Sequence, residues 1–360
     1  MELTTKTNSD FREVAELVKV QSKNKKDYAV TPSSVWIDRN NKLNIDDSSQ
    51  TMFDMNDHFN QQISSAYKIP KQYYDRLRNE YPDLYQITVN TFLALDDNKR
   101  YIRTINGTAR AFLSKRYQKI DNENVLNSLL LIIKDNLVDT GLDIETKDCS
   151  LTEKKMYIKL IDRSRDEIIN TSVKANDRVF PGIILSNSEV GAGSVRIEPF
   201  IWRQVCKNGM ISADVYRKYH VGGNIDEDNE HYRQATQIQM MKTVTMQMKD
   251  IILGTFFNPD WFRNECNRLE ISAERKVTAK DKVKFCEVVA DNFNLGKNEK
   301  NTYLENFLSE GDYSQYGTSQ ALTQTAQSVR SYDRRIELER KAGKFIDVSE
   351  KHWNNLNNIN

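Results

Sequence analysis

The segment Tyr101-Ile-Arg-Thr-Ile-Asn-Gly-Thr-Ala-Arg-Ala-Phe-Leu113 carries the strongest local structural signal in the chain. Two runs of strand-forming residues, 101–105 and 108–113, flank the dipeptide Asn106-Gly107. Asn-Gly favours the positive φ angles of a type I′ turn, so the segment predicts a two-residue β-hairpin. Asp121 follows as the expected N-cap of a helix over residues 122–137. Its expected inner face comprises Val125, Leu126, Leu129, Leu130 and Ile133.

The rest of the chain reads as runs of strands followed by runs of helices. Before the hairpin, helical spacing precedes an apolar strand expected over residues 88–95. Further strands are expected at 156–161, 182–187 and 194–201, and the periodic segments after residue 231, including one over 317–342, are expected to be helices. This order predicts an α+β fold. We expect a mostly antiparallel sheet that includes the basic hairpin, packed with helices, and a helical C-terminal half.

We expect three parts along the chain. Residues 1–50 are rich in Lys, Asn, Ser and Asp and would form a polar, peripheral N-terminal arm. Residues 51–228 would form the α+β core domain, and residues 229–360 a helical C-terminal region. A chain of 360 residues is long enough for either one large core or two ordinary ones.

Overall charge indicates no partner, because 52 Lys and Arg residues face 51 Asp and Glu residues. Any electrostatic footprint must therefore come from local clustering. The N-terminus lacks the apolar segment of a signal peptide, and no apolar run is long enough to span a bilayer. We expect a cytoplasmic protein without a membrane partner. The four cysteines form no C-x-x-C pair and are expected to be reduced.

The hairpin region is unusually basic. Seven cations and no acid lie between Asp97 and Asp121, with three aromatic rings among them. Cations neutralise phosphates and rings stack on unpaired bases, so the segment fits single-stranded nucleic acid. The predicted contact residues are Arg100, Tyr101, Arg103, Arg110, Phe112, Lys115, Arg116, Tyr117 and Lys119. Strand alternation would place Tyr101 beside Arg103, and Arg110 beside Phe112. The alternative is a solvated face, or ion pairs with Asp96, Asp97, Asp121 and Glu123.

Two weaker basic clusters follow. Arg196 and Arg203 are added to the predicted nucleic-acid contacts, because Phe200, Trp202, Lys207 and residues 216–219 supply rings and cations nearby. Ordinary core packing is the simpler interpretation of Phe200 and Trp202. Lys154, Lys155 and Lys159 form a third patch, although charged strand edges often serve only to prevent aggregation.

No pattern predicts catalytic residues, a metal site or a cofactor. The chain has no Walker A motif and no H-E-x-x-H, and Gly191-Ala-Gly193 lacks the third glycine of a dinucleotide loop. Cys206 near His220 could be a nucleophile, but a buried structural cysteine is the simpler interpretation. Asp96-Asp97 with Asp121 and Glu123 could bind magnesium in a nuclease, although acids at these positions usually cap turns and helices.

Several stretches together resemble the phage/plasmid-like protein family, a domain of unknown function found on phages, prophages and plasmids. The first is Ile102–Tyr117 with Ile120-Asp-Asn122, and the second is Ser188-Glu-Val-Gly-Ala-Gly-Ser-Val-Arg-Ile-Glu-Pro-Phe200. Lys68-Ile-Pro-Lys-Gln-Tyr-Tyr74 and Tyr316-Gly317-Thr318 are similar to flanking parts of the family, but residues 320–323 depart from its pattern. The resemblance implies a mobile-element origin and supplies no activity or catalytic residues.

Three functional hypotheses remain. The first is a homo-oligomeric protein that binds single-stranded DNA in recombination or replication without ATP, by analogy with annealing proteins. The second is a phage interaction protein that binds a host or defence protein. The third is the metal-dependent nuclease. We expect a binding protein rather than an enzyme.

Overall fold

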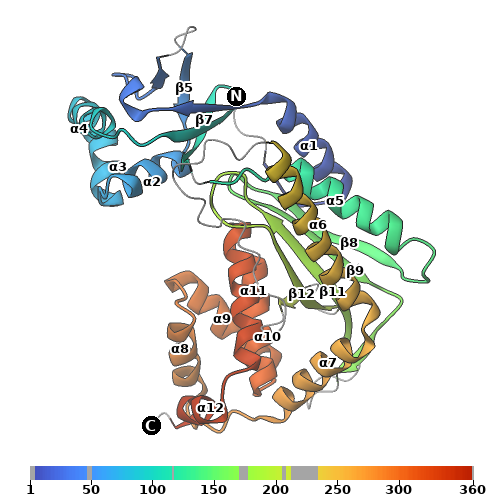
Figure 1. The fold of residues 1–360 in the computed structure, drawn as a ribbon. Coiled ribbons are helices and arrows are strands. Elements are labelled where there is room, and N and C mark those ends of the chain that lie inside the picture. The colour runs from blue at the N-terminus through green and yellow to red at the C-terminus, as the bar shows by residue number, and fades with distance from the viewer. Residues whose placement is uncertain are drawn as a thin grey trace.

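The structure is a computed structural model that describes residues 5–46, 51–115, 117–169, 177–204, 208–211 and 234–358. Two mostly antiparallel sheets and a set of helices that dominates the C-terminal half confirm the predicted α+β class (Figure 1). The larger sheet lies at the centre of the molecule, and the smaller sheet forms a separate lobe beside it.

The central sheet, called sheet A, is antiparallel, with the strand order β1-β8-β9-β11-β12-β13 and with β10 also paired to β11. Its strands are β1 (Lys6–Ser9), β8 (Ile144–Leu151), β9 (Met156–Asp162), β10 (Glu167–Ile169), β11 (Asp177–Asn187), β12 (Arg196–Arg203) and β13 (Asn208–Ile211). Every residue of β9 is buried, and so is nearly every residue of β11. Both faces of sheet A are therefore covered.

Three helices cover one face of sheet A, and we call them the outer helical layer. They are α1 (Phe11–Asn24), α5 (Asn122–Asn136) and α6 (Gln234–Phe257). Val14 and Val18 of α1 share one hydrophobic core with Leu129 of α5, Met248 of α6 and Ile158 of β9. In Figure 1 the three helices run side by side over β8, β9 and β11.

The opposite face of sheet A packs against the helices α10 (Gln315–Ser328) and α11 (Tyr332–Ile346). Tyr332 and Ile336 of α11 lie in one apolar cluster with Ile161, Phe180 and Trp202 of the sheet. The other C-terminal helices are α7 (Pro259–Glu274), α8 (Lys282–Asn292), α9 (Lys297–Glu310) and α12 (Glu350–Asn357). They form the largest core of the protein together with α10 and α11.

The smaller lobe contains sheet B, with the strand order β2-β6-β7-β5-β4-β3. Its strands are β2 (Lys25–Val30), β3 (Val35–Ile37), β4 (Leu43–Ile45), β5 (Thr51–Met55), β6 (Arg100–Ile105) and β7 (Thr108–Ser114). The pair β5–β7 is parallel and the other pairs are antiparallel. The lobe also contains the short 3-10 helix η1 (Pro32–Ser34) and the helices α2 (Asp57–Ala66), α3 (Lys71–Glu80) and α4 (Pro82–Ala94).

The predicted hairpin is confirmed as β6 and β7. Asn106 and Gly107 have φ angles of 49° and 78°, as a type I′ turn requires. The register shifts within the hairpin, from the pair Arg103–Ala111 to the pair Thr104–Ala109. Arg110 is thus the extra residue of a β-bulge, and a bulge changes which face the following side chains occupy.

Several sequence expectations were wrong. Residues 1–50 are not a peripheral arm, because β1 pairs with β8, α1 packs in the core of sheet A and β2 pairs with β6. Residues 88–95 belong largely to α4 rather than to a strand. Leu130 is exposed, and Ile132 takes the buried position on α5. The segment 317–342 is divided between two helices, because α10 ends at Ser328 and Ser331 caps the start of α11.

Candidate functional site

The two stretches that stand out in the sequence meet in the structure. The turn of residues 188–195, which joins β11 to β12, lies against the hairpin of the smaller lobe. Val190 accepts hydrogen bonds from His58 and Gln62 of α2, both at 2.8 Å, if the His58 Nε2 carries its proton. Gly191 has a φ angle of 76°, and a Cβ there would lie 2.6 Å from the Leu113 side chain. We call this contact region the interlobe joint.

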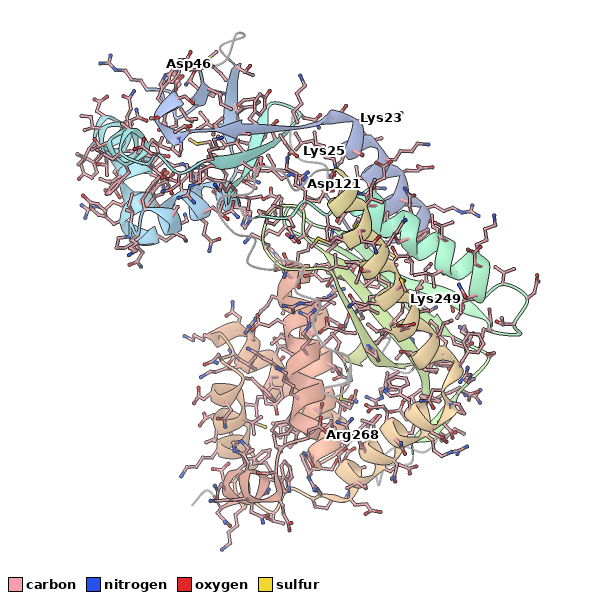
Figure 2. All side chains as sticks on the ribbon, viewed as in Figure 1. Lys23, Lys25, Asp46, Asp121, Lys249 and Arg268 are labelled. Carbon is pink, nitrogen blue, oxygen red and sulfur yellow. The ribbon has the colours of Figure 1, made fainter. Side chains whose placement is uncertain are left out.

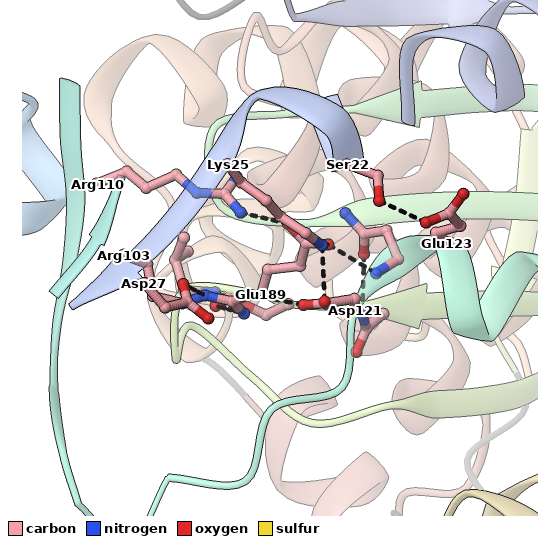
Figure 3. A network of polar contacts seen from close by, with 12 residues as sticks. Ser22, Lys25, Asp27, Arg103, Arg110, Asp121, Glu123 and Glu189 are labelled. Atoms are coloured by element: carbon pink, nitrogen blue, oxygen red, sulfur yellow. Dashed lines mark hydrogen bonds and ion pairs between the residues drawn. The ribbon is translucent and has the colours of Figure 1, made fainter. Parts of the chain in front are cut away.

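Arg103 is the centre of the interlobe joint and is only 1% exposed. Its guanidinium donates to Asp27 at 2.8 Å, to Asp121 at 2.7 Å and to the backbone carbonyl of Glu189 at 2.9 Å (Figure 3). These partners come from β2, from the residue before α5 and from the β11–β12 turn. One side chain therefore connects the smaller lobe to the outer helical layer, through Asp121, and to sheet A, through the β11–β12 turn.

Glu189 supplies the complementary negative charge and is 5% exposed. Its carboxylate pairs with Arg110 and with Lys25, the latter at 3.2 Å. It also accepts a hydrogen bond from the backbone N–H of Asn122 at 2.8 Å, and so it caps the first turn of α5. The expected cap, Asp121, makes no such bond because Arg103 and Lys25 occupy its oxygens.

The pKa values of the joint follow from this pairing. Burial raises the pKa of Glu189, but the charges of Arg110 and Lys25 outweigh burial and hold it below its usual value. Burial likewise raises the pKa of Asp121, and Arg103 and Lys25 lower it further than burial raises it. Both carboxylates are thus charged at neutral pH, and the joint is an ion-pair network rather than a proton-transfer site.

The hairpin does not form the outward-facing basic surface predicted from the sequence, because its arginines form ion pairs with carboxylates of the same chain. Arg103 and Arg110 are buried in the joint, and Arg100 pairs with Asp96 at 2.9 Å. Lys119 pairs with Asp27 at 3.0 Å and lies over the Tyr101 ring.

The rings near the hairpin are also partly or fully buried. Phe112 is 5% exposed and packs in the core of the smaller lobe. Because of the bulge, its side chain does not share a face with that of Arg110, which points into the interlobe joint. Tyr117 donates to the Ser188 carbonyl at 2.8 Å. Tyr101 is partly buried under Lys119. Lys115 is exposed, and Arg116 lies outside the described residues.

The two weaker basic clusters are not joined to the hairpin surface. Arg203 is 4% exposed and pairs with Asp177, and Phe200 and Trp202 are core residues of sheet A. Arg196 is partly buried. Lys159 is buried against Glu339 at 2.9 Å. Residues that lie outside the described chain are Cys206, Lys207, Tyr216, Arg217, Lys218, Tyr219 and His220.

The carboxylates proposed for a nuclease are engaged in other contacts. Asp96 binds Arg100 and Asn98, and Glu123 accepts a hydrogen bond from Ser22. Within the described residues, no three His, Cys, Asp or Glu side chains are placed to hold a metal ion. Burial raises the pKa of the thiols Cys149, Cys266 and Cys286 to about 12, so these cysteines are poor nucleophiles at neutral pH.

The outer helical layer presents cations of a different kind, which sequence reasoning missed. Six exposed cations on its three helices form no ion pair with any described carboxylate. They are Arg12, Lys19 and Lys23 of α1, Lys134 of α5, and Lys242 and Lys249 of α6. Figure 2 shows Lys23 and Lys249 on the outside of this layer. The exposed carboxylates Glu16, Asp135 and Asp250 dilute the layer but leave an excess of positive charge.

The position of these cations on their helices explains why they face outward. Val14 and Val18 are buried on α1, and Lys19 and Lys23 lie on the opposite side of the helix. A periodicity calculation on each helix could have found this face. Only the fold, however, shows that three helices distant in sequence bring their polar faces into one surface.

The fold and the joint define an α+β body with a docked smaller lobe. The sequence of residues 110–343 matches a family described as a domain of unknown function (DUF932). The match covers more than half of the chain, so the protein belongs to this family. No curated protein and no solved structure shows significant similarity to it. No helix within the described ranges is long and apolar enough to cross a membrane.

Proposed function

We propose that the protein binds nucleic acid through the outer helical layer, and that it acts on single-stranded DNA of a mobile element in recombination or replication without ATP. The observation that carries this proposal is the set of six exposed cations without acidic partners on α1, α5 and α6. The mobile-element setting rests on the resemblance of the hairpin and the 188–200 stretch to phage and plasmid proteins.

Unpaired lysines are suited to phosphate contacts. Binding of a phosphate backbone releases condensed counterions, and a cation already held by a carboxylate contributes little to that release. Lys242 and Lys249 lie two turns apart on one side of α6, and Lys19 and Lys23 lie about one turn apart on α1. The layer exposes the aliphatic side chains of Leu131 and Met246, and the ring of Phe257 at the end of α6 is 43% exposed. Recognition would therefore depend mainly on phosphates.

The test measures the affinity of a fluorescent single-stranded oligonucleotide as a function of salt concentration. Each lost phosphate contact lowers the slope of log K against log salt by about 0.7 for a single strand. The double variant K242Q/K249Q should therefore flatten the slope by about 1.4. A duplex of the same sequence, measured in parallel, gives the strand preference.

The matched control is the double variant K297Q/K351Q. Lys297 begins α9 and Lys351 lies on α12, and both are exposed lysines outside the outer helical layer. This variant loses the same two charges and should keep the salt slope of the wild type. Equal slopes for both double variants would refute the outer helical layer as the binding surface, and salt-independent or absent retention of oligonucleotide would refute nucleic-acid binding itself.

A second candidate function is binding of a host or defence protein, and the surface of α4 favours it. Leu84, Ile87 and Leu95 are 47%, 64% and 77% exposed. Asp83 is the single charged residue of this helix. Interfaces between proteins are depleted of charge at their centres, so this face suits a protein better than a phosphate backbone. Recovery of a stoichiometric host protein by the wild type but not by I87D would support this alternative.

A further inference from the structure

A cavity of about 610 Å³ opens on the face of sheet A that is opposite the outer helical layer. Its walls come from β1, β8, β11 and β12, from the end of β9, and from α10 and α11. Small-molecule sites have volumes of about 300–1,000 Å³, so this cavity has the size of a ligand site. The network described at the interlobe joint contributes no residue to it.

The floor of the cavity is apolar and aromatic. Ile161, Phe180 and Trp202 come from three adjacent strands, and their side chains share one face of sheet A. Arg163, just beyond β9, places its guanidinium 5.5 Å from the centre of the Phe180 ring. Because Phe180 and Trp202 are only 3% and 8% exposed, a flat ligand ring that entered the cavity would mainly meet this guanidinium, which lies over the Phe180 ring.

Positive charge is in slight excess around the cavity. Lys147 and Arg163 line it and share a single carboxylate, Glu145. On the other side, Arg335 and the buried Lys159 lie against Asp148 and Glu339. The four cations in and beneath the cavity wall are thus paired with three carboxylates, Glu145, Asp148 and Glu339. One positive charge is left for a ligand. The guanidinium of Arg163 is the most accessible of these groups, with 43% of its side chain exposed.

One wall of the cavity has an irregular backbone. Asn8 of β1 and Asp148 of β8 both have positive φ angles, 55° and 50°, in the region where β1 and β8 shift register. Arg335 donates to Asn8 at 2.7 Å and bridges to Asp148 at 3.3 Å. Asn and Asp adopt this left-handed conformation more readily than other residues with a side chain, so the two residues accommodate the register shifts of β1 and β8.

The same wall contains buried polar atoms that lack a hydrogen-bond partner. Within the described residues, Arg335 Nε and Asp148 Oδ1 are buried without a hydrogen-bond partner, which is destabilising unless a ligand or water satisfies them. Beneath them, burial raises the pKa of Glu339 although Lys159 is its ion-pair partner. Orphaned polar atoms and buried charges are both destabilising, and here they lie around one cavity.

We infer that this cavity binds a nucleoside monophosphate, either free or as the phosphorylated end of a nucleic-acid strand. The base lies beside Trp202 and against the Arg163 guanidinium that covers Phe180, and the phosphate is held by Arg163 and Lys147. A single excess positive charge matches a single phosphate group better than a triphosphate. The site is separate from the surface proposed for nucleic-acid backbone, because sheet A lies between the two.

The experiment is calorimetric titration of the full chain with AMP, GMP, CMP and UMP, each compared with ATP, adenosine and inorganic phosphate. At least one monophosphate should bind tenfold or more tightly than all three comparison ligands. A short oligonucleotide with and without a terminal phosphate distinguishes a free nucleotide from a strand end. If no monophosphate binds more tightly than inorganic phosphate, the inference is wrong.

Variants connect binding to the cavity. Arg163→Gln and Lys147→Gln should each weaken the best monophosphate about tenfold, the loss expected for one charge-assisted hydrogen bond. Arg163 is well exposed, so its substitution should leave the fold intact, and the thermal midpoint checks this. Lys351→Gln on α12, outside both the cavity and the outer helical layer, should leave the affinity unchanged. Unchanged affinity in both cavity variants would overturn the assignment, and that result would leave the proposal for the outer helical layer untouched.

Discussion

The interlobe joint and the outer helical layer contain the same kinds of cation in opposite electrostatic states. In the joint, Arg103 and Arg110 are buried and paired with carboxylates. On the layer, Lys242 and Lys249 are exposed and have no acidic partner among the described residues. A basic stretch of sequence can therefore be structural, and cations scattered along the chain can form a surface. A cation is structural when the fold places a carboxylate beside it, and it can bind a ligand when the fold does not.

The largest expected effect is at Arg103. Arg103→Ala leaves the carboxylates of Asp27 and Asp121 and the Glu189 carbonyl without their donor. Removal of one member of a buried ion-pair network costs about 3–5 kcal/mol, so we expect this loss in the free energy of unfolding measured with urea. The control, Lys119→Ala, removes a more exposed partner of Asp27 and should cost about 1 kcal/mol or less.

The Arg103 variant also tests the comparison itself. If the joint is structural, oligonucleotide binding by the folded fraction of Arg103→Ala should equal that of the wild type. If Arg103→Ala keeps its stability but no longer binds oligonucleotide, the binding site is on the hairpin, as the sequence predicted. That result would refute the structural role of Arg103.

Acid should loosen the joint, and Glu189→Gln should remove part of that response. The pKa of Glu189 is lower in the folded chain than its ordinary value of 4.5, so folding favours the charged form. The resulting stability is present above the unfolded pKa and is lost as pH falls through the folded pKa. We expect the urea midpoint of the wild type to fall below pH 4.5 more steeply than that of Glu189→Gln.

At neutral pH the Glu189→Gln variant should be less stable by about 1.5–3 kcal/mol, because Arg110 loses a charged partner. The amide oxygen can still accept from the backbone of Asn122, so the start of α5 should persist. Parallel pH curves for the two proteins would show that Glu189 does not titrate as the ion pairs imply.

The hairpin turn gives a smaller effect. Gly107 has a φ angle of 78° and has no atom within 4 Å of the Cβ that an alanine would add. Gly107→Ala therefore introduces backbone strain without a clash and should cost about 1 kcal/mol in urea unfolding. Gly193→Ala provides a contrast, because its φ is not in the left-handed region and the nearest atom belongs to the flexible Lys155 side chain. Equal costs for the two variants would contradict the type I′ turn.

The sequence predicted these local features well because their causes are local. The Asn-Gly turn, the helix that begins after Asp121 and the α+β class each depend on neighbouring residues. Alternation was also a fair guide, except at Arg110, where the bulge inserts one residue and moves Phe112 into the core. A bulge leaves no reliable mark in a single sequence.

The fate of the hairpin arginines could not be predicted, because their partners are distant. Asp27 lies 76 residues before Arg103, and Glu189 lies 79 residues after Arg110. The same limit hid the outer helical layer, whose cations come from three helices between residues 11 and 257. The cavity too has walls from β1 to α11. Neighbouring residues determine the helices and strands, whereas contacts between distant residues determine which cations have no carboxylate partner.

The smallest expected effect on stability is on the outer helical layer. Lys242 and Lys249 are exposed and make no ion pair with a described residue, so K242Q/K249Q should change the free energy of unfolding by no more than about 0.5 kcal/mol. The same variant should flatten the salt dependence of oligonucleotide binding, whereas Arg103→Ala should do the reverse and change stability alone. If K242Q/K249Q instead unfolds the chain as readily as Arg103→Ala, the two regions do not differ in the way their contacts imply. Urea unfolding and oligonucleotide titration of the same two preparations decide between these outcomes, because each region predicts a change in one measurement and none in the other.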